Sequence, residues 1–410
     1  MKRICILTQS HLCKNPRVVK EAKTLSKAGY NVIILTTFTS EALLKEDLEV
    51  IDTSCIQYFG ATNIIVSQSN FFRRTYIRFQ RRLAGELVYR TGIQLPQALG
   101  YNAYGFLKAA LQIKADLYIS HQEMPTWVGC ELIRKGYKVG FDFEDWYSHD
   151  LLPQARRQRP IKLLRKIEHF ALIKGIFIYT TSDSMAAEMA KAYSVVMPAT
   201  IYNVFPYSER ERLDGIHKDR KDLSKVSMIW FSQTVGPGRG LELLIRALEL
   251  VAIPIELHIR GNINLQYKTY LLDRFPNSLG HAIYFHDIVS NYELISRLAE
   301  HDIGLALEQA TPESRNLTVT NKFFQYLQAG LAVIASDTLG QTEIANKAIN
   351  AIFTYKNDSR EDLAKQLTRL ISKKYMLKQS KKNALTIVQE RYSWEYEEKR
   401  LILAISKANL

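Results

Sequence analysis

The feature that most constrains the fold of this 410-residue chain is an alternation of short apolar segments with amphipathic ones. Near the start, "RICILT" is typical of a buried strand, "PRVVKEAKTLSKAG" of an amphipathic helix and "YNVIILTT" of a second strand. The alternation continues through "ADLYISH", "PTWVGCELIRKG" and "YKVGFDF". Strands that are separated by helices usually pair in parallel, with helices over both faces of the sheet. The first half is therefore predicted to be an α/β domain.

A second series of the same kind begins at "VSMIWFSQ" and runs through "GLELLIRALELV", "IELHIRGN", "DIGLALEQ" and "LAVIASD". Between the two series, over residues 198–225, the regular alternation gives way to proline, charged and turn residues, which is the composition of an interdomain linker. The chain is also longer than a single core usually holds. We therefore predict an α/β chain with two Rossmann-like parallel-sheet domains that face a cleft, with 1–203 as the first, 204–225 as a linker and 226–388 as the second.

Composition limits the classes of partner without choosing among them. The 55 Lys and Arg residues against 41 Asp and Glu leave a formal charge of +14, which suits a phosphate-rich substrate, nucleic acid or an anionic membrane face. The four cysteines show no CxxC spacing, so neither a disulfide framework nor a zinc site is indicated, and a reducing, cytoplasmic compartment is expected. No apolar run reaches the roughly 18 to 20 residues of a membrane span, so any membrane contact is expected to be peripheral.

Polar residues of the first half follow predicted strands. Asn15 and Arg17 stand beside a helix start, where anions are favoured, in a loop that lacks the GxGxxG of a dinucleotide site. His121 ends the segment "DLYISH", and Glu144 lies in "DFEDW" at another strand end. Each of these residues has a plain alternative as a structural or solvated side chain, which the pattern does not exclude.

Two segments of the second half have the features of phosphate sites. "SQTVGPGRGLELL" places Arg239 among glycines between a strand and a helix, and the missing GK[ST] disfavours a Walker loop and ATP hydrolysis. "VTNKFFQYLQAG" opens a helix at Thr320 and Asn321 and brings Lys322 into its first turn, where free N–H groups favour anions. A flexible turn and an ordinary capped core helix would look much the same.

Two basic stretches, residues 70–90 and 154–175, interleave arginine with phenylalanine, tyrosine and leucine at helical spacing. This pattern fits an amphipathic helix on an anionic bilayer, and it predicts peripheral contact of a cytoplasmic protein with the inner membrane face. Nucleic-acid binding is a rival interpretation, but no recognition motif supports it and no nucleic-acid partner is expected. A solvated basic face is an equal alternative.

Seven segments, in this order and over almost the whole chain, resemble the retaining glycosyltransferases of the GT-B fold, in particular the large family 4 of nucleotide-sugar-dependent enzymes. They are "NPRVVKEAKTLSKAGYNVIIL", "ADLYISH", "TTSDSMAAEMAKAY", "GPGRGLELLIRAL", "HDIGLAL", "NKFFQYLQAGLAVIASD" and "RYSWEYEEKRL". The resemblance implies that the second domain holds the donor and the first holds the acceptor. It also implies that a helix in residues 389–410 crosses back to the first domain.

The activity implied by the resemblance is transfer of a sugar, with retained configuration, from a nucleotide diphosphate sugar to a glycan or lipid-linked glycan in cell-surface polysaccharide synthesis. Neither a metal nor a cofactor is expected. By resemblance, His121 lies near the donor sugar, and Arg239 and Lys322 stabilise the leaving diphosphate. The residues expected on the donor side are Gly238, Gly240, Arg260, Asn262, Arg315, Thr320, Asn321 and Gln325, and those on the acceptor side are Asn15, Arg17 and Glu144.

Two positions depart from the family pattern. Many relatives carry two glutamates separated by seven residues, where this chain has Leu317 and Gln325. A glutamine amide can still bond ribose hydroxyls, but more weakly than a carboxylate, and the sugar contact is then expected from Glu308 or Arg315. The departures keep open a non-catalytic relative that binds nucleotide sugar or a partner glycosyltransferase. Among enzymes, the rival is a nucleotide-sugar epimerase of the same fold.

Overall fold

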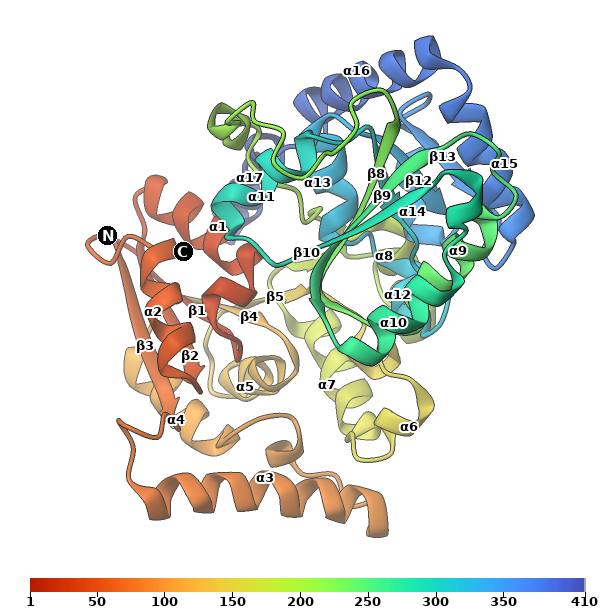
Figure 1. The fold of residues 1–410 in the computed structure, drawn as a ribbon. Helices are drawn as coiled ribbons and strands as arrows, with labels where there is room; N and C mark the ends of the chain where they lie inside the picture. The colour runs from red at the N-terminus through yellow and green to blue at the C-terminus, as the bar shows by residue number, and fades with distance from the viewer. Residues whose placement is uncertain (409–410) are drawn as a thin grey trace. The chain divides into compact units, whose positions relative to one another are not determined.

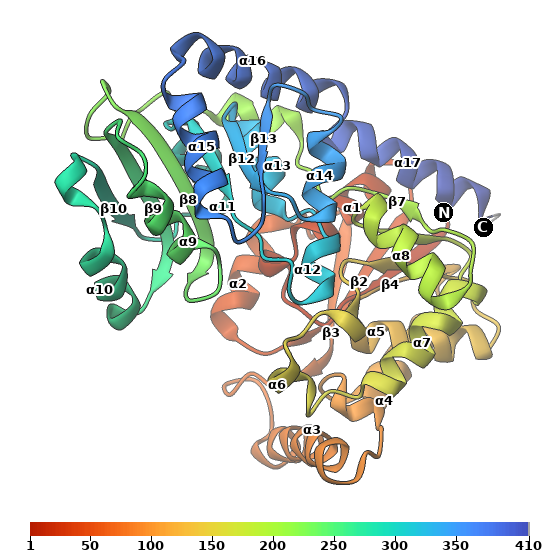
Figure 2. The ribbon, with the colours of Figure 1, turned by 90° about the vertical axis from the view of Figure 1, so that its right-hand side faces the viewer.

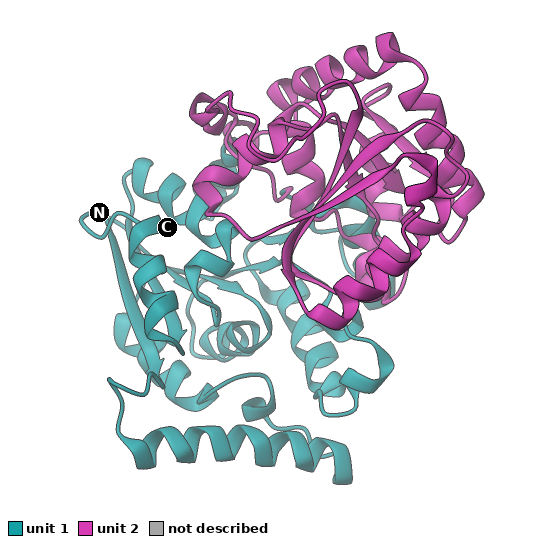
Figure 3. Cartoon of the chain, in the orientation of Figure 1, with its two compact units in different colours: residues 1–201, 398–410 teal, residues 202–397 magenta. Residues whose placement is uncertain are grey.

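The chain, in a computed structural model that describes residues 1–408, divides into two compact units (Figure 3). Unit 1 comprises residues 1–201 and the chain from Glu398 onward, and unit 2 comprises residues 202–397. Each unit contains one parallel sheet, which confirms the predicted fold class. Residues 204–225 lie within unit 2 and include the short helix η4 (Tyr207–Arg212).

The sheet of unit 1 has seven strands in the order β3-β2-β1-β4-β5-β6-β7. Its central strand β1 pairs in parallel on both sides, so that Leu7 lies opposite Leu35 of β2 and Ser120 of β4. The central strands are apolar nearly throughout because helices cover both faces (Figures 1 and 2). The strands are β1 (Arg3–Leu7), β2 (Asn31–Phe38), β3 (Ile56–Asn63), β4 (Leu117–His121), β5 (Val139–Phe143), β6 (Ile178–Thr180) and β7 (Ala199–Thr200).

The helices of unit 1 mostly follow the predicted alternation with strands. Asn15 is the N-cap of the first, and its side chain accepts a hydrogen bond from the main-chain N–H of Val18. The α-helices are α1 (Pro16–Lys27), α2 (Glu41–Val50), α3 (Phe71–Thr91), α4 (Ala103–Ile113), α5 (Glu123–Arg134), α6 (Pro153–Arg156), α7 (Ile161–Lys174) and α8 (Asp183–Tyr193). Short 3-10 turns are η1 (Leu12–Lys14), η2 (Pro96–Ala98) and η3 (Tyr147–His149).

The sheet of unit 2 has six strands in the order β10-β9-β8-β11-β12-β13, again with every pair parallel. The pairing of β8 with β9 is irregular between Phe231 and Thr234. Gly261 of β9 fits there because a Cβ atom would lie 2.1 Å from the main-chain oxygen of Ser232. The strands are β8 (Val226–Val235), β9 (Ile255–Ile263), β10 (Ala282–His286), β11 (Ile303–Ala306), β12 (Ala332–Ser336) and β13 (Ile352–Tyr355).

The helices of unit 2 are again placed between its strands. They are α9 (Leu241–Leu248), α10 (Leu265–Arg274), α11 (Asn291–Ala299), α12 (Glu313–Leu317), α13 (Asn321–Ala329), α14 (Leu339–Ala345), α15 (Arg360–Ile371) and α16 (Lys374–Glu390), with the 3-10 turn η5 (Asn277–Leu279). In α13, Phe323 and Phe324 are buried, and Gly330 ends the helix at φ 79°. No helix among residues 1–408 has both the length and the apolarity that crossing a membrane requires.

The last helix, α17 (Trp394–Lys407), begins in unit 2 and ends in unit 1. Inside unit 1, Glu398 accepts a hydrogen bond of 3.0 Å from the hydroxyl of Thr24, and the carbonyl of Ala408 accepts one of 3.3 Å from Lys138. The prediction that the C-terminal helix returns to the first domain is confirmed.

Candidate active site

Both sheets reverse their strand order beside the first strand of the unit, between β1 and β4 in unit 1 and between β8 and β11 in unit 2. In open parallel sheets, ligands bind outside the carboxyl ends of the strands at such a reversal. In unit 1, His121 ends β4, and in unit 2, Ser232 and Glu308 lie near the carboxyl ends of β8 and β11. The strand order alone therefore brings these candidate residues of each unit to one edge of its sheet.

Lys322 in unit 2 is held between a buried carboxylate and an aromatic ring. Its Nζ lies 2.5 Å from Oε1 of Glu308 and 5.1 Å from the ring centre of Trp230. Both charged side chains are only 13% exposed. Trp230 is fully buried on β8, so the ammonium at the first turn of α13 contacts the face of a fixed aromatic ring.

Two further cations act on the same carboxylate. Burial alone would raise the pKa of Glu308, but Lys322, then Arg315 and Arg239, hold that pKa below its usual range. Arg239 also donates from Nη1 to the hydroxyl of Ser232 at 3.1 Å. One cation of unit 2, Lys322, therefore contacts this carboxylate, and two others, from separate segments, lie near enough to lower its pKa.

The loop that carries Arg239 depends on glycine. Gly238 and Gly240 have φ angles of 71° and 85°, in the left-handed region that other residues seldom adopt. At Gly240 a Cβ atom would also lie 2.5 Å from the Cβ of Leu307, next to Glu308. The close approach places this loop against the residues that follow β11.

The start of α13 presents unsatisfied polar groups. Thr320 is the N-cap as predicted, but its hydroxyl does not cap the helix; this buried oxygen has no hydrogen-bond partner among residues 1–408. The first N–H groups of a helix also lack partners within the helix. Asn321 and Gln325 are both partly exposed on α13. An anionic ligand would satisfy this helix start and the neighbouring cations together.

Two other residues expected on the donor side have different surroundings. Arg260 is buried, forms an ion pair with Asp219 and donates at 2.5 Å to the carbonyl of Asp287. Its guanidinium is therefore engaged inside unit 2. Asn262, two residues further along β9, is exposed.

His121 in unit 1 is fully buried and has both ring nitrogens engaged. Nε2 lies 2.6 Å from Glu21, and Nδ1 lies 3.0 Å from Glu144. Burial alone would lower the pKa of His121, but Glu21, then Glu144 and Asp142, raise it to about 10. The histidine is thus a buried imidazolium, and neither nitrogen is free to bond a sugar hydroxyl in this structure.

The residues expected on the acceptor side support the same cluster. Arg17 is 1% exposed, pairs with Asp142 at 2.6 Å and donates to the carbonyl of Ile201 at 2.8 Å. Asn15 donates at 2.8 Å to Glu144, whose side chain remains 17% exposed. Arg17 therefore lies in the interior of unit 1, and Glu144 is the carboxylate of this group that reaches solvent.

Three side chains of this cluster also lie as close together as the ligands of a metal ion. Glu21, His121 and Asp142 each offer a ligand atom within 4.8 Å of the others. In this structure the positive charge they need comes from Arg17 and the imidazolium of His121. An absence of metal stays a prediction from the resemblance.

Gln122 was not predicted, yet it organises the loop after β1. It has φ 68°, a strained value for this residue. Its side-chain oxygen accepts hydrogen bonds from the hydroxyl of Thr8 at 3.0 Å and from the N–H groups of Gln9 and Ser10 at 3.0 and 3.2 Å. Its position just after His121 at a strand end was the available signal. Glu21 gave none, because it lies inside an ordinary amphipathic helix.

The raised pKa of His121 predicts a loss of stability at alkaline pH. Because the folded pKa of about 10 exceeds the unfolded value of about 6.5, the stabilisation is fully present below pH 6.5 and is lost as the pH rises toward 10. His121→Gln should lower the free energy of unfolding by about 3 kcal/mol near pH 6, as expected for a broken buried pair. This deficit should shrink toward pH 10 in urea denaturation series.

The control is His217→Gln, since His217 is exposed, and it should show no deficit at either pH. A deficit for His121→Gln that stays constant from about pH 6 to 10 would mean that the folded protein holds a neutral imidazole.

Comparisons with known proteins agree with this architecture. Residues 226–373, in unit 2, match the family described as glycosyl transferases group 1. No match was found among curated proteins. HepE of Anabaena, solved in complex with UDP and glucose, aligns over 99% of this chain and 100% of its own, with a TM-score of 0.67 and 15% identity.

Two further solved structures show how widely the fold is used. Sucrose-phosphate synthase of Thermosynechococcus elongatus aligns over 99% of both chains, with a TM-score of 0.73 and 14% identity. A putative UDP-N-acetylglucosamine 2-epimerase of Listeria monocytogenes aligns over 99% of this chain and 96% of its own, with a TM-score of 0.57 and 11% identity. The resemblance predicted from the sequence is confirmed: the chain has the GT-B fold, and residues 226–373 match the group 1 glycosyltransferases.

Proposed function

We propose that the chain is a retaining glycosyltransferase that moves a sugar from a nucleotide diphosphate sugar to a glycan or lipid-linked glycan acceptor. In this proposal the reaction takes place in the cytoplasm and serves the synthesis of cell-surface polysaccharide. The observation that carries the proposal is the group of Arg239, Arg315 and Lys322 around Glu308 at the start of α13. The family match of residues 226–373 supports the same activity, as does the UDP-bound state of HepE.

The charge of this group fits a diphosphate. The three cations and the one buried carboxylate together give this group of side chains an excess of two positive charges. Breaking the bond between the sugar and the diphosphate develops negative charge on the leaving oxygen. Guanidinium, ammonium and N–H donors that are already in place stabilise this charge without reorganisation. In this proposal Arg239 and Lys322 contact the phosphates, and no metal is required for that step.

Glu308 gives the group its order. A lysine among arginines would otherwise be repelled, and its flexible side chain would be free to leave. The ion pair with Glu308 and the contact with Trp230 fix the ammonium of Lys322 at the first turn of α13. The hydroxyl of Thr320 and the first N–H groups of the helix then complete a donor set that faces the phosphates.

In unit 1, we assign Glu144 to the acceptor and His121 to positioning it. Glu144 is partly exposed and is held by Asn15 and His121, so it can accept a hydrogen bond from an acceptor hydroxyl. The imidazolium and Asn15 also keep its pKa lowered, although burial alone would raise it. A carboxylate with a lowered pKa is a weak base and a good hydrogen-bond acceptor, so its role is orientation. Arg17 acts indirectly by holding Asp142.

One observation favours a second candidate, a non-catalytic relative that binds nucleotide sugar or a partner glycosyltransferase. Leu317, at the position of a family glutamate, is 1% exposed and therefore cannot contact a sugar. Gln325, at the second position, is neutral. A protein that has lost these contacts could keep the phosphate site without the chemistry.

A panel of UDP-, GDP- and ADP-sugars tests the donor site and separates the two candidates. At least one donor should raise the melting temperature of the purified protein, because a ligand that binds only the folded state stabilises it. Transfer or slow hydrolysis of that donor, measured by release of the nucleoside diphosphate, identifies an enzyme. Stabilisation without turnover under any acceptor identifies the binding protein, and the absence of any shift would reject both candidates.

Arg239→Ala tests the role of the cation in the glycine loop. Loss of a donor to the developing charge should cost about 3 kcal/mol of transition-state stabilisation, or roughly a hundredfold in kcat/KM. Arg246→Ala is the matched control, because Arg246 is exposed on α9, the helix that follows the same loop. It should leave the kinetics unchanged. Equal kinetics for the two variants would remove Arg239 from the mechanism.

Gln325→Glu tests the contact with the nucleotide. If Gln325 bonds the ribose hydroxyls, a carboxylate in its place should bind them more strongly and tighten donor binding by roughly threefold to tenfold, the range expected for a charge-assisted bond. Titration calorimetry with the stabilising donor measures the change, with Gln379→Glu on exposed α16 as the control. An affinity that stays flat or falls would place the ribose elsewhere.

A further inference from the structure

Helix α3 in unit 1 packs through one narrow face. Ile77, Ala84 and Val88 are buried, and their spacing of i, i+7 and i+11 places them on one side of the helix. Ala84 and Val88 form a small cluster with Ala98 of η2. Figures 1 and 2 show this 21-residue helix at the edge of unit 1.

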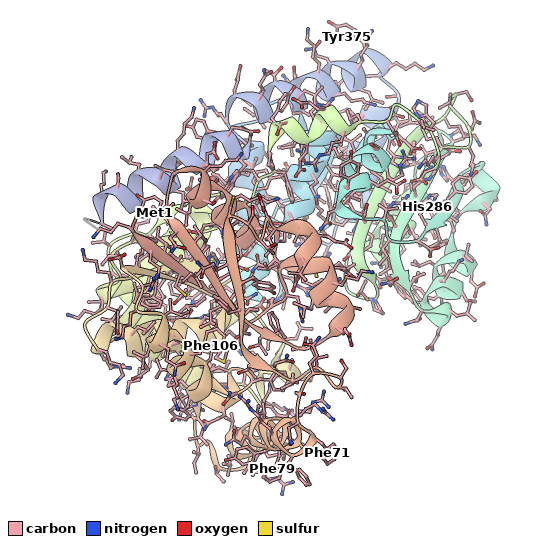
Figure 4. All side chains as sticks on the ribbon, turned by 90° about the vertical axis from the view of Figure 1, so that its left-hand side faces the viewer. Met1, Phe71, Phe79, Phe106, His286 and Tyr375 are labelled. Atoms are coloured by element: carbon pink, nitrogen blue, oxygen red, sulfur yellow. The ribbon has the colours of Figure 1, made fainter. Side chains whose placement is uncertain are left out.

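A second apolar row lies on the opposite side and is exposed. Phe72, Tyr76, Phe79 and Leu83 follow the spacing i, i+4, i+7 and i+11, and they are 79%, 60%, 59% and 45% exposed. We call these four residues the exposed stripe. Figure 4 labels Phe79, together with Phe71 at the start of the helix, at the outer edge of unit 1. A contiguous apolar row of this kind marks an interaction surface.

The charge of α3 is strongly positive. The helix contains one acidic residue, Glu86, and six arginines: Arg73, Arg74, Arg78, Arg81, Arg82 and Arg90. The acidic residue pairs with Arg90 at 3.1 Å, which leaves five arginine charges without a carboxylate on the helix itself. Arg74 and Arg81 lie over the rings of Phe71 and Tyr101.

The second basic stretch of the sequence adjoins the first in space. The side chain of Gln158 donates to Glu86 at 3.2 Å, and the N–H of Leu163 donates to Gln94 at 3.2 Å. Residues 151–166, around α6, contain six Lys and Arg residues and no acidic one. These hydrogen bonds join the two stretches, which the sequence presents separately, into one basic surface within unit 1. Figure 2 shows α6 near α3. We call it the α3–α6 surface.

We propose that the α3–α6 surface docks on an anionic lipid bilayer. The exposed stripe enters the boundary between headgroups and acyl chains, and the arginines and lysines beside it bind lipid phosphates. An amphipathic helix with aromatic residues on one face and basic residues beside it has the composition of helices that lie in the plane of a membrane. Arginine stems can follow the apolar surface while their guanidinium groups stay in the headgroup region.

The continuity of the apolar stripe favours a bilayer over nucleic acid. Bases stack on separate aromatic platforms in a positively charged groove. In α3 the aromatic residues form a row along one helix face, and the row ends in an aliphatic residue, Leu83. An apolar layer can bury such a row along its full length. The proposal stands on α3 and α6 alone and does not depend on the donor site of unit 2.

Vesicle flotation with the full chain tests the proposal. The wild type should bind vesicles of phosphatidylglycerol and phosphatidylcholine in equal parts at low salt, and it should not bind vesicles of phosphatidylcholine alone. Arg78→Gln with Arg82→Gln should weaken binding roughly thirtyfold, because each cation near an anionic surface contributes about 1 kcal/mol. Phe72→Ser with Phe79→Ser should weaken it by at least about tenfold and lower the binding that survives high salt.

One double variant and one single variant at exposed positions of α16 are the matched controls. Lys378→Gln with Lys382→Gln removes two exposed charges elsewhere, and Tyr375→Ser removes an aromatic side chain that is 82% exposed (Figure 4). Both should bind vesicles as the wild type does. Melting temperatures confirm that each variant is folded, and the shift caused by the nucleotide sugar should be the same in all of them.

Three results would overturn the proposal. The first is a folded wild-type protein that does not bind anionic vesicles at low salt. The second is unchanged vesicle binding by the stripe variant, which would leave a solvated basic face. The third is evidence for another partner of the surface. Tighter binding of a single-stranded oligonucleotide than of vesicles would be such evidence, and so would self-association that the stripe variant abolishes.

Discussion

Every strand pair in both sheets is parallel, and the first strand of each unit lies inside its sheet, with a neighbour on either side. This constraint decides where polar residues can gather. The strand interiors are buried on both faces, and the connections diverge where the strand order reverses. In unit 1 the reversal lies beside β4, which ends in His121. In unit 2 it lies beside β11, which leads to Glu308. The two charged clusters occupy these positions, where the topology leaves space for polar side chains.

The two clusters balance their charges differently. In unit 1 two buried carboxylates, Glu21 and Asp142, and the partly exposed Glu144 are paired with Arg17 and the imidazolium of His121, so the cations are already used. In unit 2 one buried carboxylate, Glu308, faces three cations. Only the second arrangement has positive charge to offer a ligand. The physical difference supports a diphosphate in unit 2 and a neutral, hydroxyl-bearing acceptor beside Glu144 in unit 1.

The sequence was sufficient for the fold and for part of the site. Short apolar runs and helical patterning place the strands and helices, and the order of elements then brings Arg239 and Lys322 to one edge of a sheet. Ion pairs between residues far apart in the sequence were not predictable. A cation at a strand end gives the same sequence pattern whether it binds a ligand or pairs with a buried carboxylate. Arg17 and Arg260 are examples: both are expected at ligands and both are buried in ion pairs. Glu21 bonds His121 from 100 positions away, within a helix that looks ordinary.

The central claim is that unit 2 recognises two phosphates through Arg239, Lys322 and the start of α13. Titration calorimetry with UDP and UMP, and with GDP and GMP as a second pair, tests it directly. The diphosphate of the preferred base should bind at least about tenfold more tightly than the monophosphate, because the second phosphate reaches the excess positive charge. The difference should fall as salt is added. Equal affinities for diphosphate and monophosphate would contradict the account.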